Sequence, residues 1–305
     1  MLSHPMSPKD EQTKGLALVL LSTFAYGAMS IFAKTAYAAG ATSATVLAWR
    51  FTIATLLFAL LSSRRSRGLA WRDHGLLWGL GLVFVVNALV YFKGLETLPA
   101  STAAVLVYTY PVMVTLLSGL LGFDRFTLRE LIAALLAFSG CALTAGAVEG
   151  GGPGVWLILL SAFLYAVYML LGSRFASHLP AEASASHTAQ AAAMVCVPWA
   201  ALQGTVLLPP EPRAWLAVFA IAAICTVVAL RALLSGMARI GAVRASVLSS
   251  FEVVVTLCLA ALFLGEKLGS RQVVGATLIL GAVVFQNLGV LRRMAQRVGG
   301  APSVS

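Results

Sequence analysis

Residues 20–26 read LLSTFAY, and residues 159–165, 139 positions later, read LLSAFLY. Five of the seven letters are identical. A second block recurs at an offset of 142, in the same order along the chain. Its first copy holds Ala100, Ala103, Val105, Leu106, Val112, Leu120, Arg129 and Leu136, and its second copy holds Ala242, Ala245, Val247, Leu248, Val254, Leu262, Arg271 and Leu278. Two blocks at nearly one offset indicate that the chain consists of two related halves.

The composition places these halves in a membrane. Of the 305 residues, 60% are hydrophobic and only 10% are charged, and the mean hydropathy is +0.91. A soluble domain carries charge on about a quarter of its residues. This chain has too few charges to cover a soluble surface, and its composition also excludes the disordered, fibrous and disulfide-rich classes. An integral membrane protein remains.

Apolar runs and the Gly, Pro and charged residues between them predict ten membrane-spanning helices. A helix needs about 20 residues to cross the hydrocarbon core, and the runs do not alternate as the strands of a membrane β-barrel do. The expected spans are 15–38, 43–62, 75–95, 101–121, 127–147, 154–175, 183–207, 214–236, 243–264 and 270–291. The predicted fold class is therefore all-α integral membrane, with five helices in each half.

The domain organisation follows from this count. The expected parts are an N-terminal tail at 1–14, a first five-helix repeat at 15–149, a linker at 150–153, a second repeat at 154–291 and a C-terminal tail at 292–305. Because five is odd, the second repeat enters the membrane from the opposite side. Inverted repeats are typical of secondary transporters, whose binding site lies near the midplane between the repeats.

Basic residues predict the orientation. The net charge is +10, and most of the 21 Lys and Arg residues fall on one set of connections, which the positive-inside rule places in the cytoplasm together with both termini. We attribute this charge to topology and to anionic lipid. A nucleic-acid partner is not expected.

Glu252 is the foremost candidate for chemistry. Ionisable residues in hydrocarbon are costly and are functional candidates by default, and Glu252 lies close to the middle of the predicted ninth span. A buried carboxylate takes up a proton more readily than an exposed one. Glu252 could therefore couple transport to protons or bind a substrate ammonium. The alternative is a structural hydrogen bond to a neighbouring helix.

Arg50, Lys93 and Arg231 lie within predicted spans, and Lys34 lies near the end of the first span. Arg50 and Arg231 are farthest from the membrane surfaces, and either could compensate Glu252 or hold a substrate carboxylate. Snorkelling and structural pairing are the alternatives. Lys34 and Lys93 are nearer span ends, where snorkelling is expected.

Polar and aromatic stripes predict a cavity wall. Ser22, Tyr26 and Ser30 share one helical face, as do Asn87 and Tyr91, because each spacing is four residues. Tyrosine offers an apolar ring and a hydroxyl, which suits an amphipathic solute, although such stripes can equally hold helices together. The predicted cavity residues are Ser22, Tyr26, Asn87, Tyr91, Tyr108, Tyr110, Tyr165, Tyr168, Arg231 and Glu252. Pro111 favours a kink and is the predicted gate or hinge.

Enzymatic and ATP-driven functions are not expected. The sequence holds no Walker motif, so ATP is not an expected partner. Its four cysteines, Cys141, Cys196, Cys225 and Cys258, each lie alone in an apolar segment, and the histidines are scattered. We therefore predict no catalytic residue, no metal site and no cofactor, and we interpret the cysteines as packing residues. The glycines of the fifth and tenth spans are interpreted as sites of tight packing: Gly140, Gly146, Gly275 and Gly281.

These features together resemble the drug/metabolite transporter superfamily, in particular its EamA-type ten-helix exporters. The resemblance rests on Tyr26-Gly27 to Lys34, Trp49-Arg50-Phe51, Leu98-Pro99-Ala100 with Tyr110-Pro111, and Phe251-Glu252-Val253 with Gly265-Glu266-Lys267. The family commonly has Glu-Pro where this chain has Glu252-Val253, which puts a kink in the ninth helix in doubt.

The resemblance implies a basket of two inverted repeats in a bacterial inner membrane, with a central cavity lined by helices 1, 3, 4, 6, 8 and 9. It implies export of small amphipathic metabolites, above all amino acids, and the tyrosines favour the branch that exports aromatic and neutral amino acids. The expected partners are the solute, the lipid bilayer and a coupling proton. The alternatives are a lipid-handling membrane protein and an exporter of drugs or other metabolites.

Overall fold

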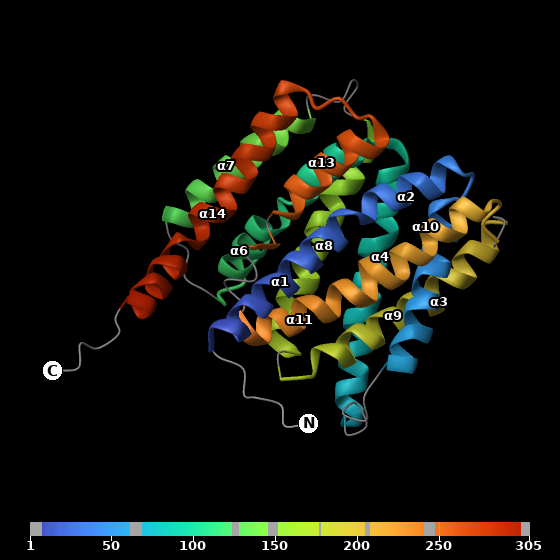
Figure 1. The fold of residues 1–305 in the computed structure, drawn as a ribbon, viewed down its shortest axis with the longest axis horizontal. Helices are drawn as coiled ribbons and strands as arrows, with labels where there is room; N and C mark the ends of the chain where they lie inside the picture. The colour runs from blue at the N-terminus through green and yellow to red at the C-terminus, as the bar shows by residue number, and fades with distance from the viewer. Residues whose placement is uncertain are drawn as a thin grey trace.

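The computed structural model describes residues 8–61, 69–123, 128–145, 152–176, 178–204, 208–240, 248–249 and 251–299, and within these residues all regular structure is helical (Figure 1). Six helical stretches are long and apolar enough to cross a membrane: Glu11–Ala38, Ser43–Leu61, Trp71–Thr97, Ala100–Leu120, Pro153–Phe175 and Pro212–Met237. Shorter apolar helices cover Leu131–Thr144, Glu252–Leu264 and Ser270–Phe285. The protein is therefore a multi-pass membrane protein.

The helices follow one another without strands in the described residues. The first half contains α1 (Pro8–Gly27), α2 (Met29–Ala38), α3 (Ser43–Leu61), α4 (Trp71–Thr97), α5 (Ala100–Val107), α6 (Tyr110–Leu120) and α7 (Leu128–Ala145). The second half contains α8 (Pro153–Phe175), α9 (Ala181–Leu202), α10 (Pro212–Ala222), the π-helix η2 (Ala223–Val228), α11 (Ala229–Ile240), α13 (Glu252–Leu264) and α14 (Ser270–Gly299).

Two of the predicted spans are interrupted near their centres. The fourth is divided at Tyr108 and Thr109. Pro111 lies in the first turn of α6, where backbone N–H groups have no partner within the helix, so the missing N–H of proline costs no hydrogen bond. In the ninth, α13 begins at Glu252 with Phe251 as its N-cap. In the part of the ninth span that the structure describes, Glu252 therefore starts a helix, whereas the sequence interpretation placed it near the middle of a continuous one. The helix starts there although the residue after Glu252 is a valine, Val253, and not a proline.

Each of the main helix pairs joins one helix from the first half of the chain to one from the second half. α7 packs along α14, α4 along α8, α1 along α11, and α3 along α9. Figure 1 shows α7 and α14 side by side at one edge of the bundle and α1 beside α11 in its centre.

Glycines allow two of these pairs to approach closely. Where α1 crosses α11, a Cβ atom added to Gly236 would lie 2.9 Å from the carbonyl oxygen of Gly15 and 2.5 Å from Cγ2 of Val19. Where α4 crosses α8, a Cβ atom added to Gly94 would lie 3.2 Å from the carbonyl oxygen of Gly154. Small residues at such crossings permit the van der Waals packing that associates helices in lipid. The predicted packing role is confirmed for Gly140 and Gly275, which face each other between α7 and α14. It is wrong for Gly281, where an added Cβ atom would have no neighbour within 4 Å, and Gly146 lies outside the described residues.

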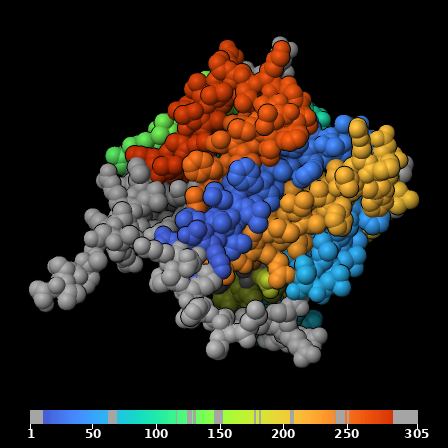
Figure 2. Space-filling model, in the orientation of Figure 1, coloured from blue at the N-terminus to red at the C-terminus, as the bar shows by residue number. Residues whose placement is uncertain are grey.

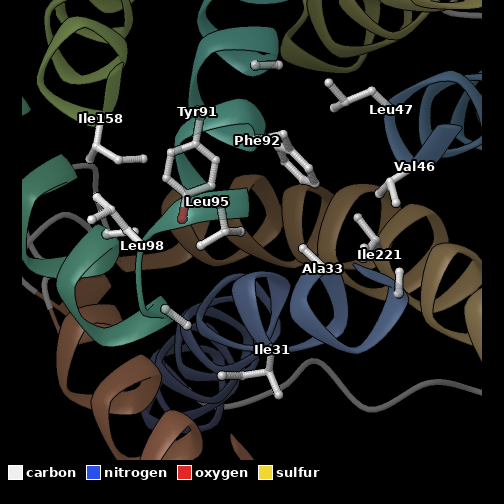
Figure 3. Packing of buried hydrophobic residues seen from close by; sticks show 14 of the residues in the cluster. Ile31, Ala33, Val46, Leu47, Tyr91, Phe92, Leu95, Leu98, Ile158 and Ile221 are labelled. Carbon is white, nitrogen blue, oxygen red and sulfur yellow. The ribbon is translucent and has the colours of Figure 1, made fainter. Parts of the chain in front are cut away.

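The core lies between the halves, and apolar side chains also cover the outside. Figure 3 shows Ile31 and Ala33 of α2, Tyr91, Phe92 and Leu95 of α4 and Ile221 of α10 converging in the main core. Figure 2 shows α1, α11, α13 and α14 forming neighbouring strips of one outer face. Leu202, Leu60 and Leu262 are 87%, 82% and 77% exposed, as lipid-facing side chains would be.

Candidate functional site

The two helix interruptions meet at Tyr108. This side chain is buried, and its hydroxyl oxygen lies 2.7 Å from the carbonyl oxygen of Ser249 and 3.0 Å from Oε2 of Glu252. A tyrosine hydroxyl has one proton, and a backbone carbonyl only accepts. Both hydrogen bonds form fully when Tyr108 donates to Ser249 and a protonated Glu252 donates to Tyr108. The arrangement of these three groups therefore accommodates a protonated Glu252 carboxyl group.

An aromatic surface extends from this junction. The ring centroids of Tyr108 and Tyr110 are 5.7 Å apart, those of Tyr110 and Tyr165 4.7 Å, and those of Tyr165 and Tyr168 6.1 Å. Phe84 of α4 continues the row, 5.2 Å from Tyr168. Tyr110, Tyr165 and Tyr168 are half-buried, so each keeps part of its surface accessible. The structure thus brings four of the predicted tyrosines together from α8 and the α5–α6 junction.

The end of α1 brings Tyr26 close to the start of α13. A Cβ atom added to Gly27 would lie 3.3 Å from the carbonyl oxygen of Glu252, and Thr256 Oγ1 donates to the carbonyl oxygen of Gly27 at 3.0 Å. The first turn of α13 therefore lies directly against Gly27. Tyr26 is the residue before Gly27 and therefore lies next to this contact.

Two predicted polar residues, Asn87 and Tyr91, form hydrogen bonds between helices, and a third, Ser22, is buried without one. Ser161 Oγ donates to Asn87 Oδ1 at 2.7 Å, joining α8 to α4, and the hydroxyl groups of Ser30 and Tyr91 are hydrogen-bonded at 2.9 Å, joining α2 to α4. Asn87 and Tyr91 therefore hold helices together, as the alternative interpretation of the stripes allowed. Ser22 is 1% exposed, and its Oγ has no hydrogen-bond partner among the described residues.

The predicted basic residues separate into different environments. Arg231 lies apart from the tyrosines: its Nη2 is 3.5 Å from Oε1 of Glu182, and its Nη1 donates to the carbonyl oxygen of Leu61 at 3.4 Å. Its predicted place in the cavity wall is not seen in the described contacts, because its face of α11 turns toward α9 and the end of α3. Lys93 is exposed and forms an ion pair of 2.6 Å with Glu96, in keeping with its place near a span end.

The sequence interpretation missed Glu266 as a structural residue. Its Oε1 accepts a hydrogen bond from the backbone N of Ala100 at 2.7 Å, and its Oε2 accepts from the backbone N of Ser101 at 3.0 Å and from its hydroxyl at 2.5 Å. The carboxylate thus caps the start of α5, where the helix dipole favours a negative charge. The Gly265-Glu266-Lys267 motif signalled this residue but not its partner.

A hollow on the surface lies elsewhere. It measures about 530 Å³ and is lined by Trp71, His74, Gly75 and Trp78 at the start of α4. None of the predicted cavity residues lines it. Tryptophans at this position match the aromatic belt of a membrane interface.

Comparisons with known proteins agree with these features. The model of the EamA-like transporter family matches twice, at residues 13–146 and 152–288. An uncharacterised transporter of Bacillus subtilis, YcbK, is 29% identical over 93% of this chain and 95% of its own length. The aromatic amino acid exporter YddG of Ancylobacter novellus is 27% identical over 45% of this chain and 47% of its own length.

One solved crystal structure shares the fold. It aligns with a TM-score of 0.65 at 20% identity and covers 94% of this chain and 100% of its own. The two family matches together span most of the sequence, one in each half. The chain therefore belongs to the EamA-like transporter family.

Proposed function

We propose that this protein is a secondary active transporter that exports small amphipathic metabolites, above all amino acids, across a bacterial inner membrane by alternating access. The contact between Tyr108 and Glu252 carries the proposal, because it joins two interrupted helices and a carboxyl group to a row of tyrosines. Interrupted helices near the membrane midplane commonly form the substrate and ion sites of secondary transporters.

The proposal includes two inverted five-helix repeats, and the glycine crossings support it. Gly154 is the counterpart of Gly15 at the offset that relates LLSTFAY to LLSAFLY, and Gly236 is the counterpart of Gly94 at the offset of the second repeated block. Exchanging the halves therefore converts the α1–α11 crossing into the α8–α4 crossing. Val19 and Ile158 are counterparts at the first offset, and each contacts the glycine of the partner helix.

The order of helix contacts supports the same symmetry. Exchanging the halves converts the contact of α1 with α13 into the contact of α8 with α6. The same exchange maps the pair of α3 with α9 onto itself, and likewise the pair of α7 with α14. With five spans per repeat, both termini would lie in the cytoplasm, as the basic residues predict. The family model, which matches each half once, is consistent with duplication.

Proton coupling is assigned to Glu252 in this proposal. The protonated carboxyl group completes the hydrogen bonds of Tyr108, whereas the ionised carboxylate competes with Ser249 for the one hydroxyl proton. Gain or loss of the proton thereby changes the contact between the two interrupted helices. The same carboxylate, when ionised, offers a partner to a substrate ammonium.

The aromatic row supports an amphipathic substrate. Tyrosine faces contact apolar side chains and attract an ammonium group by cation–π interaction. An amino acid presents both groups, and one relative is named an aromatic amino acid exporter. The family and these relatives are transporters, which agrees with a function without catalysis.

Transport by the purified protein tests the proposal. Liposomes containing the protein are loaded with labelled L-phenylalanine, and efflux is followed with and without a pH gradient. We expect efflux above that of protein-free liposomes, and we expect the gradient to change its rate. Efflux no faster than from protein-free liposomes, for a panel of neutral amino acids, would contradict the proposal.

A further inference from the structure

Arg50 is a buried cation without a counter-charge in the described part of the chain. Its side chain is 5% exposed within α3. The sequence predicts that Arg50 pairs either with Glu252 or with a substrate carboxylate, but the Glu252 carboxyl group is hydrogen-bonded to Tyr108. Among the described residues, ion pairs join Lys93 to Glu96, His178 to Asp73, Arg231 to Glu182 and Arg239 to Glu11, and none of them includes Arg50. An unpaired charge in a membrane interior is costly. A guanidinium in this state is suited to receive a carboxylate from outside the protein.

Neighbouring groups hold the guanidinium without neutralising it. Its Nε donates to Thr226 Oγ1 at 3.2 Å, and Thr226 Oγ1 in turn donates to the carbonyl oxygen of Ile221 at 2.9 Å. Thr226 belongs to the π-helix η2, a form that is frequent at functional sites. The Arg50 Cζ atom lies 4.8 Å from the ring centroid of Phe51 and 5.3 Å from that of Phe92.

Tyr91 connects the surroundings of Arg50 with those of Glu252. Its hydroxyl group is hydrogen-bonded to Ser30, three residues after Gly27, against which the carbonyl oxygen of Glu252 lies. The Tyr91 ring is 5.7 Å from Phe92, the ring beneath the Arg50 guanidinium. Figure 3 shows Phe92 directed toward α3 while Tyr91 lies nearer to α8. The contacts of Tyr91 therefore link the Arg50 guanidinium to the helices beside Glu252, and the described contacts include no direct bond between Arg50 and Glu252.

We propose that Arg50 determines solute specificity by binding the carboxylate of an amphipathic solute whose ammonium group faces Glu252. This inference rests on the proposed transport function and adds the requirement for an anionic group. A guanidinium is planar, and its two Nη groups can make two parallel hydrogen bonds to one carboxylate while Nε remains bonded to Thr226. A solute without a carboxylate would leave the buried guanidinium unpaired, and such sites reject the incomplete solute strongly.

Three probes that differ in their charged groups test the proposal: L-phenylalanine, L-phenylalaninamide and 3-phenylpropionate. Their binding to the purified full-length protein is measured by isothermal titration calorimetry. The wild type should bind L-phenylalanine about tenfold or more tightly than the amide. Arg50→Gln should weaken binding of both carboxylates by about tenfold or more and leave the amide nearly unchanged. Arg50→Lys keeps the positive charge but lacks the planar guanidinium group. Its affinity for the two carboxylates should lie between those of the wild type and Arg50→Gln.

Two further variants keep the test independent of folding defects. Thr226→Val removes the partner of Nε and should reduce the preference for the carboxylate by a smaller factor than Arg50→Gln. It supplies the answer should Arg50→Gln fail to fold. Arg213→Gln changes an exposed arginine at the start of α10 and should leave the preference unaltered.

The outcomes separate this inference from the proposed function. Equal weakening of all three probes by Arg50→Gln and by Thr226→Val would show that Arg50 only supports the fold, and the transport proposal would stand. Wild-type binding of 3-phenylpropionate without binding of L-phenylalanine would retain the role of Arg50 and remove the amino-acid substrate. Binding of none of the probes would overturn both.

Discussion

Glu266 and Ser101 are joined by two hydrogen bonds to one oxygen atom, although 165 residues separate them along the chain. Oε2 of Glu266 accepts both the backbone N–H and the hydroxyl proton of Ser101, while Oε1 accepts the N–H of Ala100. One side chain from the second half of the protein therefore accepts hydrogen bonds from the first backbone N–H groups of a helix in the first half.

Replacing this cap should lower stability. Glu266→Ala removes all three hydrogen bonds and leaves the first N–H groups of α5 without their carboxylate, at a cost of about 1.5–3 kcal/mol. Thermal unfolding in detergent measures the loss. Lys267→Ala, at the exposed neighbouring position, is the matched control and should unfold close to the wild type. Equal unfolding temperatures for both variants and the wild type would exclude a capping role.

Proton coupling should depend on Glu252. Glu252→Gln cannot ionise, yet its amide can still donate to Tyr108, so we expect a folded protein whose transport no longer varies with pH between about 5.5 and 8. Efflux from liposomes across this range measures the dependence. Tyr108→Phe keeps the carboxyl group and removes its partner, and should change the transport rate. A variant Glu252→Gln with the pH profile of the wild type would rule out coupling at this residue.

Tyr165 of the aromatic row and Tyr26 of α1 should contribute directly to solute affinity. A cation–π contact is worth roughly 0.5–2 kcal/mol, so Tyr26→Ala or Tyr165→Ala should weaken binding roughly 2- to 30-fold. Calorimetric titration with L-phenylalanine measures this change. Phe263→Ala, which removes a ring that is 72% exposed on α13, is the control for loss of an aromatic group. Similar affinities for all three variants would remove the tyrosines from the site.

The glycine crossings should be sensitive to a single methyl group. Gly236→Ala and Gly94→Ala each place a Cβ atom against the partner helix and should destabilise the protein by about 1–3 kcal/mol. Gly79→Ala, in the same helix as Gly94 but with no atom within 4 Å of the new Cβ, should have no cost or increase stability by up to about 1 kcal/mol. Unfolding temperatures of the three variants decide the matter, and a stable Gly236→Ala would contradict the close packing.

The proposed inverted topology makes a prediction for the two positions that correspond between the halves. Arg125 and Lys267 are counterparts at the offset of the second repeated block and should lie on opposite sides of the membrane. In a background without native cysteines, Arg125→Cys should react with a membrane-impermeant thiol reagent only from the cytoplasm, and Lys267→Cys only from outside. Reaction of both from one side would refute inverted repeats.

The sequence predicts the helical membrane class and part of the local geometry. Hydropathy locates apolar helices because the bilayer selects for length and composition, and Pro111 marks the interruption at Tyr108 and Thr109. The start of α13 at Glu252 has no comparable signal, because Val253 is compatible with a continuous helix.

The partners of the charged residues depend on tertiary contacts. Arg50 and Arg231 look alike in sequence, and only packing shows that Arg231 pairs with Glu182 while Arg50 does not reach a described carboxylate. The same limit applies to Glu266, whose partners lie in the other half of the chain. Periodicity shows which residues share a face but not which helix that face contacts.

The pairing of every main helix with one from the opposite half has a consequence for biosynthesis. As the chain leaves the ribosome, α1, α3, α4 and α7 enter the membrane before α11, α9, α8 and α14 have been made. Until the second half is made, the early helices lie in the bilayer without their packing partners, and the start of α5 lacks the Glu266 carboxylate that caps it. The first half alone would therefore expose the packing faces of these helices to lipid, and α7 gains its partner only after α14 has been made.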